Sequence, residues 1–364
     1  LSGQKNLSET ILFPSTPVGM ELSGQKNLSE TILFPSTPVG KDLSGQKNLT
    51  ETLLLRDERV NQPTNIVGID AETDGLFGFD DIGIPNGVDT FTIGANTYAI
   101  VAAFMDNGVQ IIDISDPSDI VAKGSLIDSP TLRLGGAKDV DTFTIDGNTY
   151  AIVAAFTENG IQIIDISDPD YPSSAGSLID IPPLTLSGAR GVDTFTIGGN
   201  TYAIVAAFGA EFTPGAVQII DISDPDYPSP AGSLIDGPSL TLGGARGVDT
   251  FTIGANTYAI VAAFMENGVQ IIDISDPDNP DPIDAATDGL FGFDELNGAA
   301  DVQIFTIGAS TYAIVASLQD DGVQIIDVSN PENIVARGAL TDTAFSVLQE
   351  PKGVDTFTVD ASTY

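Results

Sequence analysis

The chain contains no cysteine, no histidine and no tryptophan. Without Cys and His there is no thiol nucleophile, no Ser-His-Asp triad, no imidazole general base and no ordinary zinc or copper site. Disulfides are excluded too, so cysteine usage does not indicate a compartment. The metal ligands that remain are carboxylate, hydroxyl and carbonyl oxygens, which suit hard cations such as Ca²⁺.

Positive charge is scarce: 13 Lys and Arg stand against 51 Asp and Glu, giving a net charge of −38 over 364 residues. Such a surface repels phosphate backbones and anionic lipids, so we expect no nucleic-acid partner. No apolar run approaches the ~18 residues of a membrane helix, and we expect no membrane insertion. The sequence begins at Leu1 without a signal-peptide pattern, which indicates a processed chain or a fragment.

One segment of the sequence is repeated along most of the chain. "GVDTFTIGANTYAIVAAF" occupies residues 87–104, returns verbatim from Gly247, and has close variants from Asp139, Gly191 and Asp301. A shorter copy starts at Gly353. The marker valines of these copies are Val88, Val140, Val192, Val248, Val302 and Val354, spaced 52 to 56 residues apart. A regular period near 50 residues predicts a propeller or a solenoid.

Each repeat reads as four short strands. "VDTFTI", "TYAIVAAF" and "VQIIDIS" are separated by Gly- and Asn-containing turns, and a Pro-rich corner leads to a fourth strand such as "IVAKGSLI". The middle strands are almost continuously apolar, as expected of strands covered on both faces by neighbouring blades. A two-sheet sandwich would alternate more clearly. The repeated "DISDP" acids fit turn formation better than catalysis, because every unit carries them.

The string "TYAIVAAF…NGVQIIDISDP…P…GSL" resembles the LVIVD-repeat family, whose name describes strands such as Val109–Asp113 and Val269–Asp273. The similarity covers roughly residues 54–364. The resemblance implies a β-propeller, commonly extracellular or on the cell surface and often in long arrays. It implies no single activity.

Both ends of the repeat region contribute to a sixth unit. "LLLRDERVNQPTNIVGID" (53–70) aligns with the third and fourth strands of the unit before it, and 353–364 supplies a first strand. We therefore predict an all-β fold with a single propeller over 53–364: five full blades beginning near 87, 139, 191, 247 and 301, and a sixth shared between 53–70 and 353–364. Alternatively, the array continues beyond Tyr364.

Residues 1–52 form a separate N-terminal region with a 21-residue repeat, "LSGQKNLSETILFPSTPVG". The plain interpretation is an extended tail. The alternative interpretation is strand donation, in which a spare "ETILF" segment completes the sixth blade of a neighbouring copy. The sequons at Asn6, Asn27 and Asn48 are possible glycosylation sites in an exported protein.

Two sets of charged residues recur at equivalent positions near the start of each repeat. If "VDTFT" is the innermost strand, they surround one mouth of the central channel. An inter-blade ring of salt bridges is the structural interpretation, and a polar site for an anion or sugar is the functional one. The two sets comprise Lys138, Arg190, Arg246 and Lys352, and Asp89, Asp141, Asp193, Asp249 and Asp355.

Two acidic connections have the spacing of a calcium loop. The first is "DAETDGLFGFDD" (70–81), and its twin is "DAATDGLFGFDE" (284–295). A solvated acidic connection is the alternative interpretation, since no helices flank either segment. The candidate ligands are Asp70, Glu72, Asp74 and Asp81 in the first and Asp284, Asp288 and Glu295 in the second.

The sequence thus predicts a non-enzymatic extracellular or cell-surface scaffold for adhesion or filament-like self-assembly, with no required cofactor other than possible Ca²⁺. Near-identical blades favour this, since catalysis usually makes one blade unlike the others. The alternative is a ligand-binding propeller that takes a glycan or Ca²⁺ on its loop face, and surface glycans or proteins are further candidate partners. The expanded turn at 209–216 makes that face the expected binding face.

Overall fold

The computed structural model describes Gly75, Phe79 and residues 81–210, 213–342, 348–356, 358–359 and 362–363. All of them belong to one compact unit, Ile69–Tyr364. Within these residues every regular element is a β-strand. The N-terminal region 1–52 with its three sequons, and residues 53–70 of the predicted shared blade, lie outside the described residues and stay predictions.

Five antiparallel four-stranded sheets follow one another along the chain, each with its strands paired in chain order, and we call them blades 1 to 5. Blades 1 and 2 comprise β1 (Pro85–Ile93), β2 (Asn96–Ala103), β3 (Gly108–Asp113) and β4 (Val121–Ile127), then β5 (Ala137–Ile145), β6 (Asn148–Ala155), β7 (Gly160–Asp165) and β8 (Ser173–Ile179). Blades 3 and 4 comprise β9 (Ala189–Ile197), β10 (Asn200–Ala207), β11 (Ala216–Asp221) and β12 (Ser229–Ile235), then β13 (Ala245–Ile253), β14 (Asn256–Ala263), β15 (Gly268–Asp273) and β16 (Asp281–Thr287). Blade 5 comprises β17 (Ala299–Ile307), β18 (Ser310–Ser317), β19 (Gly322–Asp327) and β20 (Val335–Thr341), and a two-stranded hairpin follows, β21 (Thr358–Val359) with β22 (Ser362–Thr363).

The four strands predicted for each repeat are confirmed in these five sheets. The turns fall where the sequence places them: Gly94 has a φ of 64°, and Asn107, Asn159 and Asn267 have φ values of 55°, 53° and 55°. Asparagine tolerates this left-handed conformation better than most residues, so the Asn-Gly pairs set the second hairpin of the blade. The predicted turn role of the "DISDP" acids also holds, since Asp116 accepts a hydrogen bond from the Ser118 N–H at 2.9 Å.

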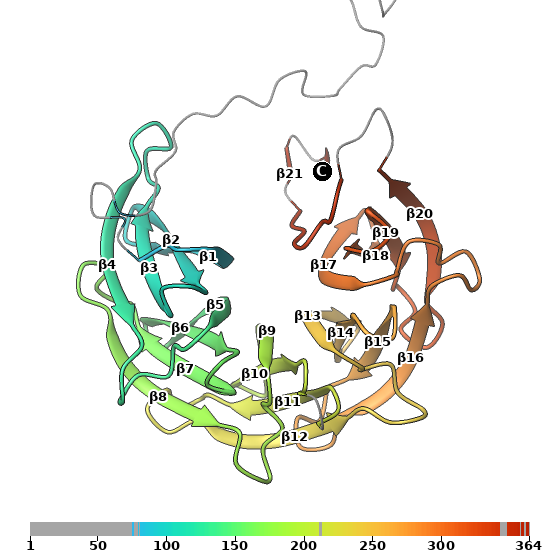
Figure 1. Cartoon of the computed structure of the whole chain (residues 1–364), viewed down its shortest axis with the longest axis horizontal. Coiled ribbons are helices and arrows are strands. Elements are labelled where there is room, and N and C mark those ends of the chain that lie inside the picture. Colours follow the sequence, from blue (N-terminus) through green and yellow to red (C-terminus); the bar gives the residue numbers. More distant parts are fainter. Residues whose placement is uncertain are drawn as a thin grey trace, which may run out of the picture. The chain divides into compact units, whose positions relative to one another are not determined.

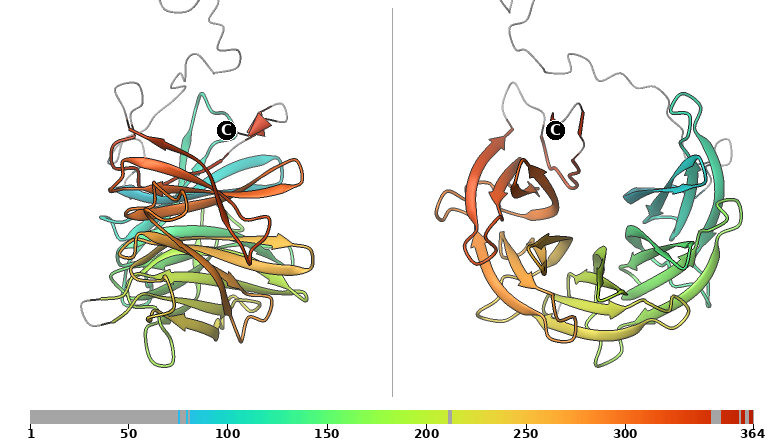
Figure 2. Two further views of the ribbon diagram at one scale, coloured as in Figure 1. Left: turned by 90° about the vertical axis from the view of Figure 1, so that its right-hand side faces the viewer. Right: turned by 180° about the vertical axis from the view of Figure 1, so that it is seen from behind.

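The blades are arranged as in a propeller. β1, β5, β9, β13 and β17 contact one another in series, and they are the innermost strands in Figure 1. The fourth strands, β4, β8, β12, β16 and β20, form the outer rim, as the view from behind also shows (Figure 2). The architecture is therefore all-β and propeller-like, with "VDTFT" on the innermost strand as the sequence predicts.

The hydrophobic core consists of layers between successive blades. Between blades 1 and 2, Phe91, Ile100 and Ile111 of one sheet meet Val140 and Val153 of the next, and the same positions recur between later blades. Within blade 1 the Tyr98 ring stacks on Phe91 at 5.4 Å, and each later blade repeats this pair. The repeated tyrosines are therefore structural, as their spacing indicates.

A second contact joins successive blades at the outer rim. The N–H of Gly232 on β12 donates to the Pro277 carbonyl in the corner of blade 4 at 2.8 Å. A Cβ at Gly232 would lie only 2.3 Å from Cδ of Pro280, so glycine is required where the fourth strand meets the next corner. Gly124 and Gly176 make the same hydrogen bond to Pro169 and Pro225.

Candidate functional site

The charged positions near the start of each repeat come together at one end of the innermost strands. Lys138, Arg190 and Arg246 are each the second residue of β5, β9 and β13. Lys352 lies in the segment 351–356 that follows blade 5. The equivalent residues on β1 and β17 are uncharged.

These basic side chains stack on phenylalanine rings. Lys138 Nζ lies 3.7 Å from the centroid of the Phe104 ring, and the Arg246 guanidinium carbon lies 3.3 Å from that of Phe264. Arg190 lies between two rings, 5.4 Å from Phe156 and 5.0 Å from Phe208. The rings reach this place because each follows the second strand of its blade, where its N–H is bonded back to the residue before the innermost strand, as Phe208 N–H is to Gly188 at 3.0 Å. Cations and aromatic faces attract one another, more strongly when water is excluded.

The predicted inter-blade salt bridges between the two sets do not form. The ion pairs among the described residues are Lys123–Asp170, Arg133–Glu158 and Arg337–Asp327, none of them in this group. Lys138, Arg190 and Arg246 have aromatic partners instead, and the aspartates have backbone partners. The two charged sets are thus two separate layers, which we call the cation–aromatic layer and the aspartate layer.

The aspartate layer links each blade to the next. Asp89 on β1 accepts hydrogen bonds from the N–H and hydroxyl of Thr142 on β5, at 2.9 and 2.6 Å. Asp193 accepts from the Thr250 N–H at 2.8 Å. Asp249 accepts from the Ile304 N–H and, at 2.9 Å, from Gln303 Nε2, and Asp141 bonds the Thr194 hydroxyl. Asp355, in the segment after blade 5, is exposed and accepts from the N–H of Thr356, its own neighbour.

Two aspartates of this layer escaped sequence analysis because only two repeats carry them. Asp139 accepts from the Val192 N–H at 3.0 Å, and Asp301 accepts from the Val354 N–H at 2.9 Å. A Cβ at Gly87 would come within 2.5 Å of the Asp139 carboxylate, and one at Gly247 within 2.5 Å of Asp301. The sequence feature that could have identified these aspartates is the residue directly before the marker valine, where an Asp in one repeat faces a Gly in the preceding repeat.

Burial raises the pKa of several of these carboxyl groups. Loss of solvent raises the pKa of Asp139 to about 8 and that of Asp193 to about 7, against the hydrogen bonds that favour the carboxylate. Asp249 and Asp301 are raised to a pKa of about 6 for the same reason. The pKa of Asp141 is likewise well above its ordinary value, first through burial and then through the charge of Asp193.

The described candidate ligands of the two predicted calcium loops do not share one arrangement. Of the first set only Asp81 is described; its carboxylate accepts the Ser125 hydroxyl, and Asp70, Glu72 and Asp74 stay predictions. In the twin, Asp284 lies within β16 and accepts from the Ile334 N–H at 2.9 Å. Burial raises the pKa of Glu295, and the charges of Asp320 and Asp288 add to the rise. Across the described part of the chain, no three acidic side chains form a group that could hold a metal ion.

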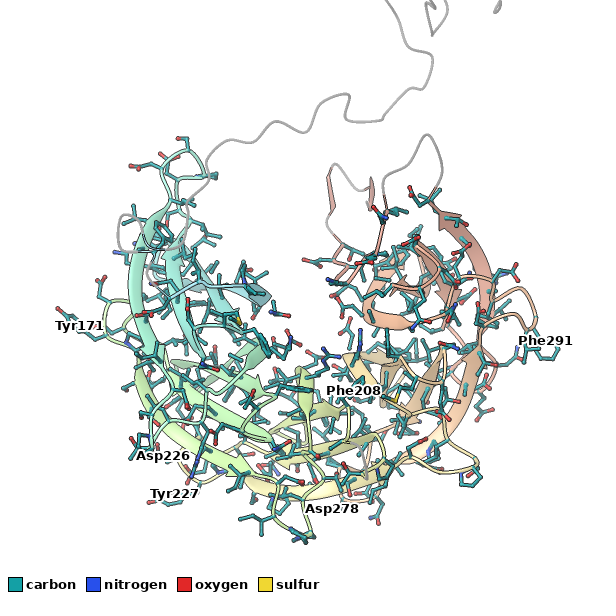
Figure 3. All side chains as sticks on the ribbon, in the orientation of Figure 1. Tyr171, Phe208, Asp226, Tyr227, Asp278 and Phe291 are labelled. Carbon is teal, nitrogen blue, oxygen red and sulfur yellow. The ribbon has the colours of Figure 1, made fainter. Side chains whose placement is uncertain are left out.

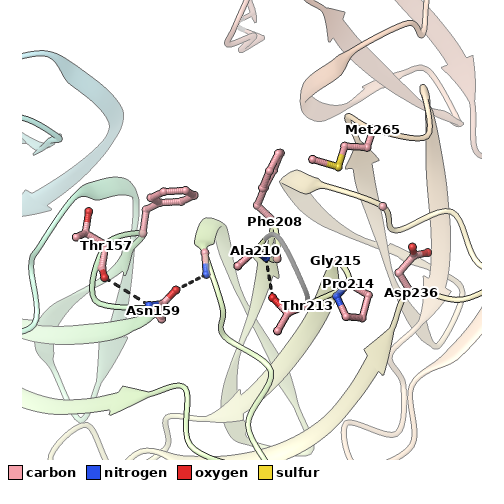
Figure 4. A pocket seen from close by; sticks show the side chains of 13 residues that line it. Thr157, Asn159, Phe208, Ala210, Thr213, Pro214, Gly215, Asp236 and Met265 are labelled. Atoms are coloured by element: carbon pink, nitrogen blue, oxygen red, sulfur yellow. Dashed lines mark hydrogen bonds between the residues drawn. The ribbon is translucent and has the colours of Figure 1, made fainter.

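The expanded turn of blade 3 borders a cavity of about 640 Å³ (Figure 4). Phe156 and Phe208, the two rings that flank Arg190, contribute to its wall, together with Met265 and Asn159. Within the turn, the Ala210 N–H donates to the Thr213 hydroxyl at 2.7 Å and to the Thr213 carbonyl at 3.1 Å, and the Thr213 N–H donates to the Ala210 carbonyl at 3.0 Å. The cavity therefore adjoins the cation–aromatic layer on the predicted binding face.

Five four-stranded blades joined through their innermost strands define a β-propeller-like repeat protein. The family model described as LVIVD repeat matches residues 96–128, 135–180, 196–236, 256–282 and 310–341, and the chain belongs to the LVIVD-repeat family. No curated protein matches its sequence. In the part of the chain that the structure describes, no helix could cross a membrane.

Solved structures resemble the fold at low sequence identity. A functionally unknown protein from Desulfotomaculum acetoxidans is 15% identical with a TM-score of 0.51, over 76% of this chain and 78% of that one. A protein from Lactobacillus plantarum is 12% identical with a TM-score of 0.51, over 71% of each chain. A periplasmic gluconolactonase from Pseudomonas aeruginosa is 10% identical with a TM-score of 0.50, over 68% of each. These likenesses support the fold and assign no activity.

Proposed function

We propose that this protein is a non-enzymatic extracellular or cell-surface scaffold that assembles with copies of itself through a sixth blade. One observation carries the proposal: the two end faces of the row of blades are apolar, and their apolar side chains are less buried than the equivalent side chains between blades. The three sequons and the strongly acidic composition support the location. The engagement of the repeated aspartates by backbone N–H groups supports a structural role for them.

On the end face of blade 1, the marker valine is much more exposed than its equivalents in the other blades. Val88 is 62% exposed, whereas Val140, Val192, Val248 and Val302 are 3 to 7% exposed. Ile112 and Ile114 are half-buried, while their equivalents in blade 2, Ile164 and Ile166, are fully buried. Blade 1 therefore exposes the surface that, in every later blade, packs against the preceding blade.

The uncovered face of blade 5 is the complementary one. Phe305, Ile314, Val323 and Ile325 are only half-buried. The residues equivalent to Ile314 in blades 1 to 4 are fully buried: Ile100, Ile152, Ile204 and Ile260. One added blade would cover both faces, because it would carry the incoming surface on one side and the outgoing surface on the other.

The hydrogen-bond register of the aspartate layer fits such a blade. Asp301 of blade 5 already binds Val354 of the sixth repeat as Asp139 binds Val192. By the same register Asp355 would bind Thr90 on β1, as Asp89 binds Thr142. The sixth repeat thus begins in the position that a sixth blade requires.

We assign the outer strands of this blade to strand-like tail segments. The tail holds three such segments, "ETILF" at 9–13 and 30–34 and "ETLLL" at 51–55, and one blade needs only one of them as its third strand. The two spare segments are available to other copies by β-augmentation. Subunits would then join tail to ring, and each new subunit would offer a further tail.

The test is the molar mass of the full chain by light scattering over a concentration series, compared with a variant lacking residues 1–42. We expect the full chain to form species well above 37.8 kDa and the shortened variant to stay monomeric. Repeating the series with Ca²⁺ and with chelator tests whether the predicted acidic loop 70–81 contributes. A constant mass near 37.8 kDa in all conditions refutes the assembly.

A matched pair of variants locates the contact. Val88→Asp places a charge on the uncovered face of blade 1 and should abolish the large species. Val121→Asp, at a 46% exposed position on the outer strand β4, should leave them intact. Equal effects of the two variants would show that the face of blade 1 is not the site of assembly.

A further inference from the structure

Positive charge in the cation–aromatic layer has no negative partner among the described residues. Lys138 donates to Asn86 Oδ1 at 3.1 Å, and its neighbours on β9 and β13 contact rings only. Nε of Arg246 is buried and has no hydrogen-bond partner. A buried donor without an acceptor is costly, and an arginine edge is well shaped for two oxygens of one anion.

The cations of this layer also lie close enough to repel one another. Burial, followed by the charges of Arg190, Arg246 and Lys352, lowers the pKa of Lys138 to about 8. Burial and the charge of Arg190 lower the pKa of Arg246 to about 9. In a protein with a net charge of −38, a group of cations without carboxylate partners among the described residues attracts an anion that the rest of the protein repels.

The aspartates of the same strands do not supply the missing charge. Asp139 accepts two backbone N–H groups, those of Val140 and Val192, at 3.0 Å each. Asp193 and Asp249 accept backbone N–H groups of the next blade. The carboxyl groups therefore face the neighbouring strands, and the cations face the rings and the end of the channel.

The cavity beside the layer has room for the rest of a small molecule. Its volume of about 640 Å³ is in the range of small-ligand sites. No described basic residue lines the cavity itself, and its acidic lining residue, Asp236, accepts the Leu242 N–H at 3.3 Å. Phe208 belongs both to the cavity wall and to the stacks of Arg190 and Arg246, so a carboxylate would have to reach past this ring to meet the guanidinium groups. Figure 4 shows Phe208 and Met265 on the inner side of this cavity, and Figure 3 shows Phe208 near the centre of the unit.

We propose that the cation–aromatic layer and this cavity form a binding site for a small organic monoanion, a carboxylate with an uncharged body. Arg190 and Arg246 bind the carboxylate through their edges, and Lys138 adds charge. The rings of Phe156 and Phe208 contact the body. A monoanion is preferred to a phosphate or polyanion because the acidic remainder of the protein repels every additional negative charge. This site does not depend on assembly of the sixth blade.

The first experiment is titration calorimetry of the full chain with benzoate, and with benzyl alcohol as the neutral control of similar size. We expect benzoate to bind, benzyl alcohol to bind at least ten-fold more weakly, and inorganic phosphate to bind more weakly than benzoate. Absence of benzoate binding, or equal binding of the alcohol, overturns the proposal.

Variants then test the residues. Arg190→Gln and Arg246→Gln should each weaken benzoate binding about ten-fold or more, the usual effect of losing a charge-assisted hydrogen bond. Arg337→Gln, which makes the same charge change on the outer strand β20, is the matched control and should bind as the wild type does. Unchanged binding in both inner variants contradicts the assignment.

A second measurement uses the wild-type protein and so does not depend on the folding of any variant. Lysine acetylation is followed by mass spectrometry at pH 8 with and without benzoate. Benzoate should slow the labelling of Lys138, because a bound carboxylate stabilises its ammonium form, and should leave Lys123 on β4 unaffected. Equal rates at Lys138 with and without benzoate refute the site.

Discussion

Blades 1 and 4 contain the same eighteen residues, 87–104 and 247–264, yet they occupy different environments. The strands and their pairing are the same: Val88 pairs with Val101 in one, and Val248 with Val261 in the other. Val88 is 62% exposed and Val248 is 7% exposed. Identical sequence thus gives identical strands and register, while the neighbouring blade decides which residues are core.

The largest expected difference is between Val248→Asp and Val88→Asp. A charge at Val248 would be buried between blades 3 and 4 without a partner, and should lower the free energy of unfolding by about 4 kcal/mol or more. Measured in the monomeric variant that lacks residues 1–42, the same change at Val88 should cost within about 0.5 kcal/mol, since the side chain is 62% exposed when no other copy covers it. Urea denaturation followed by circular dichroism measures both. Similar losses in the two variants would mean that Val88 is covered in solution.

The outer rim offers a second matched pair, Gly232→Ala and Gly338→Ala. A Cβ at Gly232 would meet the Pro280 ring and the Pro277 carbonyl at 2.3 and 2.7 Å, so we expect a loss of about 1–3 kcal/mol from overpacking. Gly338 has nothing within 4 Å, and alanine there should be neutral or stabilising by about 0.5 kcal/mol. Thermal unfolding of both variants, made in the chain that lacks residues 1–42, is the measurement, and destabilisation by Gly338→Ala there would mean that a single chain already packs a further blade beside blade 5.

The period and the strand pattern were sufficient to predict the propeller-like fold, because turn residues and apolar strands are local features. The positions of the charged residues on the innermost strand were predictable for the same reason. Their partners were not. Lys138 precedes Asp139 in the chain, yet its ammonium stacks on Phe104 of the preceding blade while Asp139 binds Val192 of the following one. Contacts between blades depend on side-chain direction, which spacing alone does not give.

The buried glutamines are a second case in which the sequence pattern does not reveal the partners of a side chain. Gln218 in "VQIID" is 1% exposed, donates to the Gly232 carbonyl at 3.1 Å and accepts from the Thr185 N–H at 3.1 Å. It therefore ties the incoming connection of its blade to the fourth strand. The sequence pattern assigned no role to this glutamine, because its partners Thr185 and Gly232 lie in other segments that only the fold brings next to it.

The pH dependence of stability tests the burial of Asp193. The folded protein raises the pKa of Asp193 to about 7, so it holds that proton more strongly than the unfolded chain does. The free energy of unfolding should therefore fall as pH rises from about 4 to about 7. Asp193→Asn should make this slope shallower. Denaturation midpoints between pH 4 and 8 test this, and stability that rises over that range would contradict the buried aspartate layer.

The smallest expected effect concerns a charge contact that only one blade pair has. Lys123 on β4 lies 3.4 Å from Asp170 in the corner of blade 2, whereas the equivalent residues of blades 2 and 3 are Ala175 and Ala231. Lys123→Ala therefore gives the outer strand of blade 1 the same residue that blades 2 and 3 have at this position. Since the Asp170 carboxylate is 59% exposed, a double-mutant cycle with Asp170→Asn should give a coupling of about 0.2–1 kcal/mol that disappears in 1 M salt. A larger, salt-independent coupling would mean that blades 1 and 2 are held together mainly by charge, and not by the apolar layer and the glycine–proline contact that blades 2 and 3 and blades 3 and 4 also have.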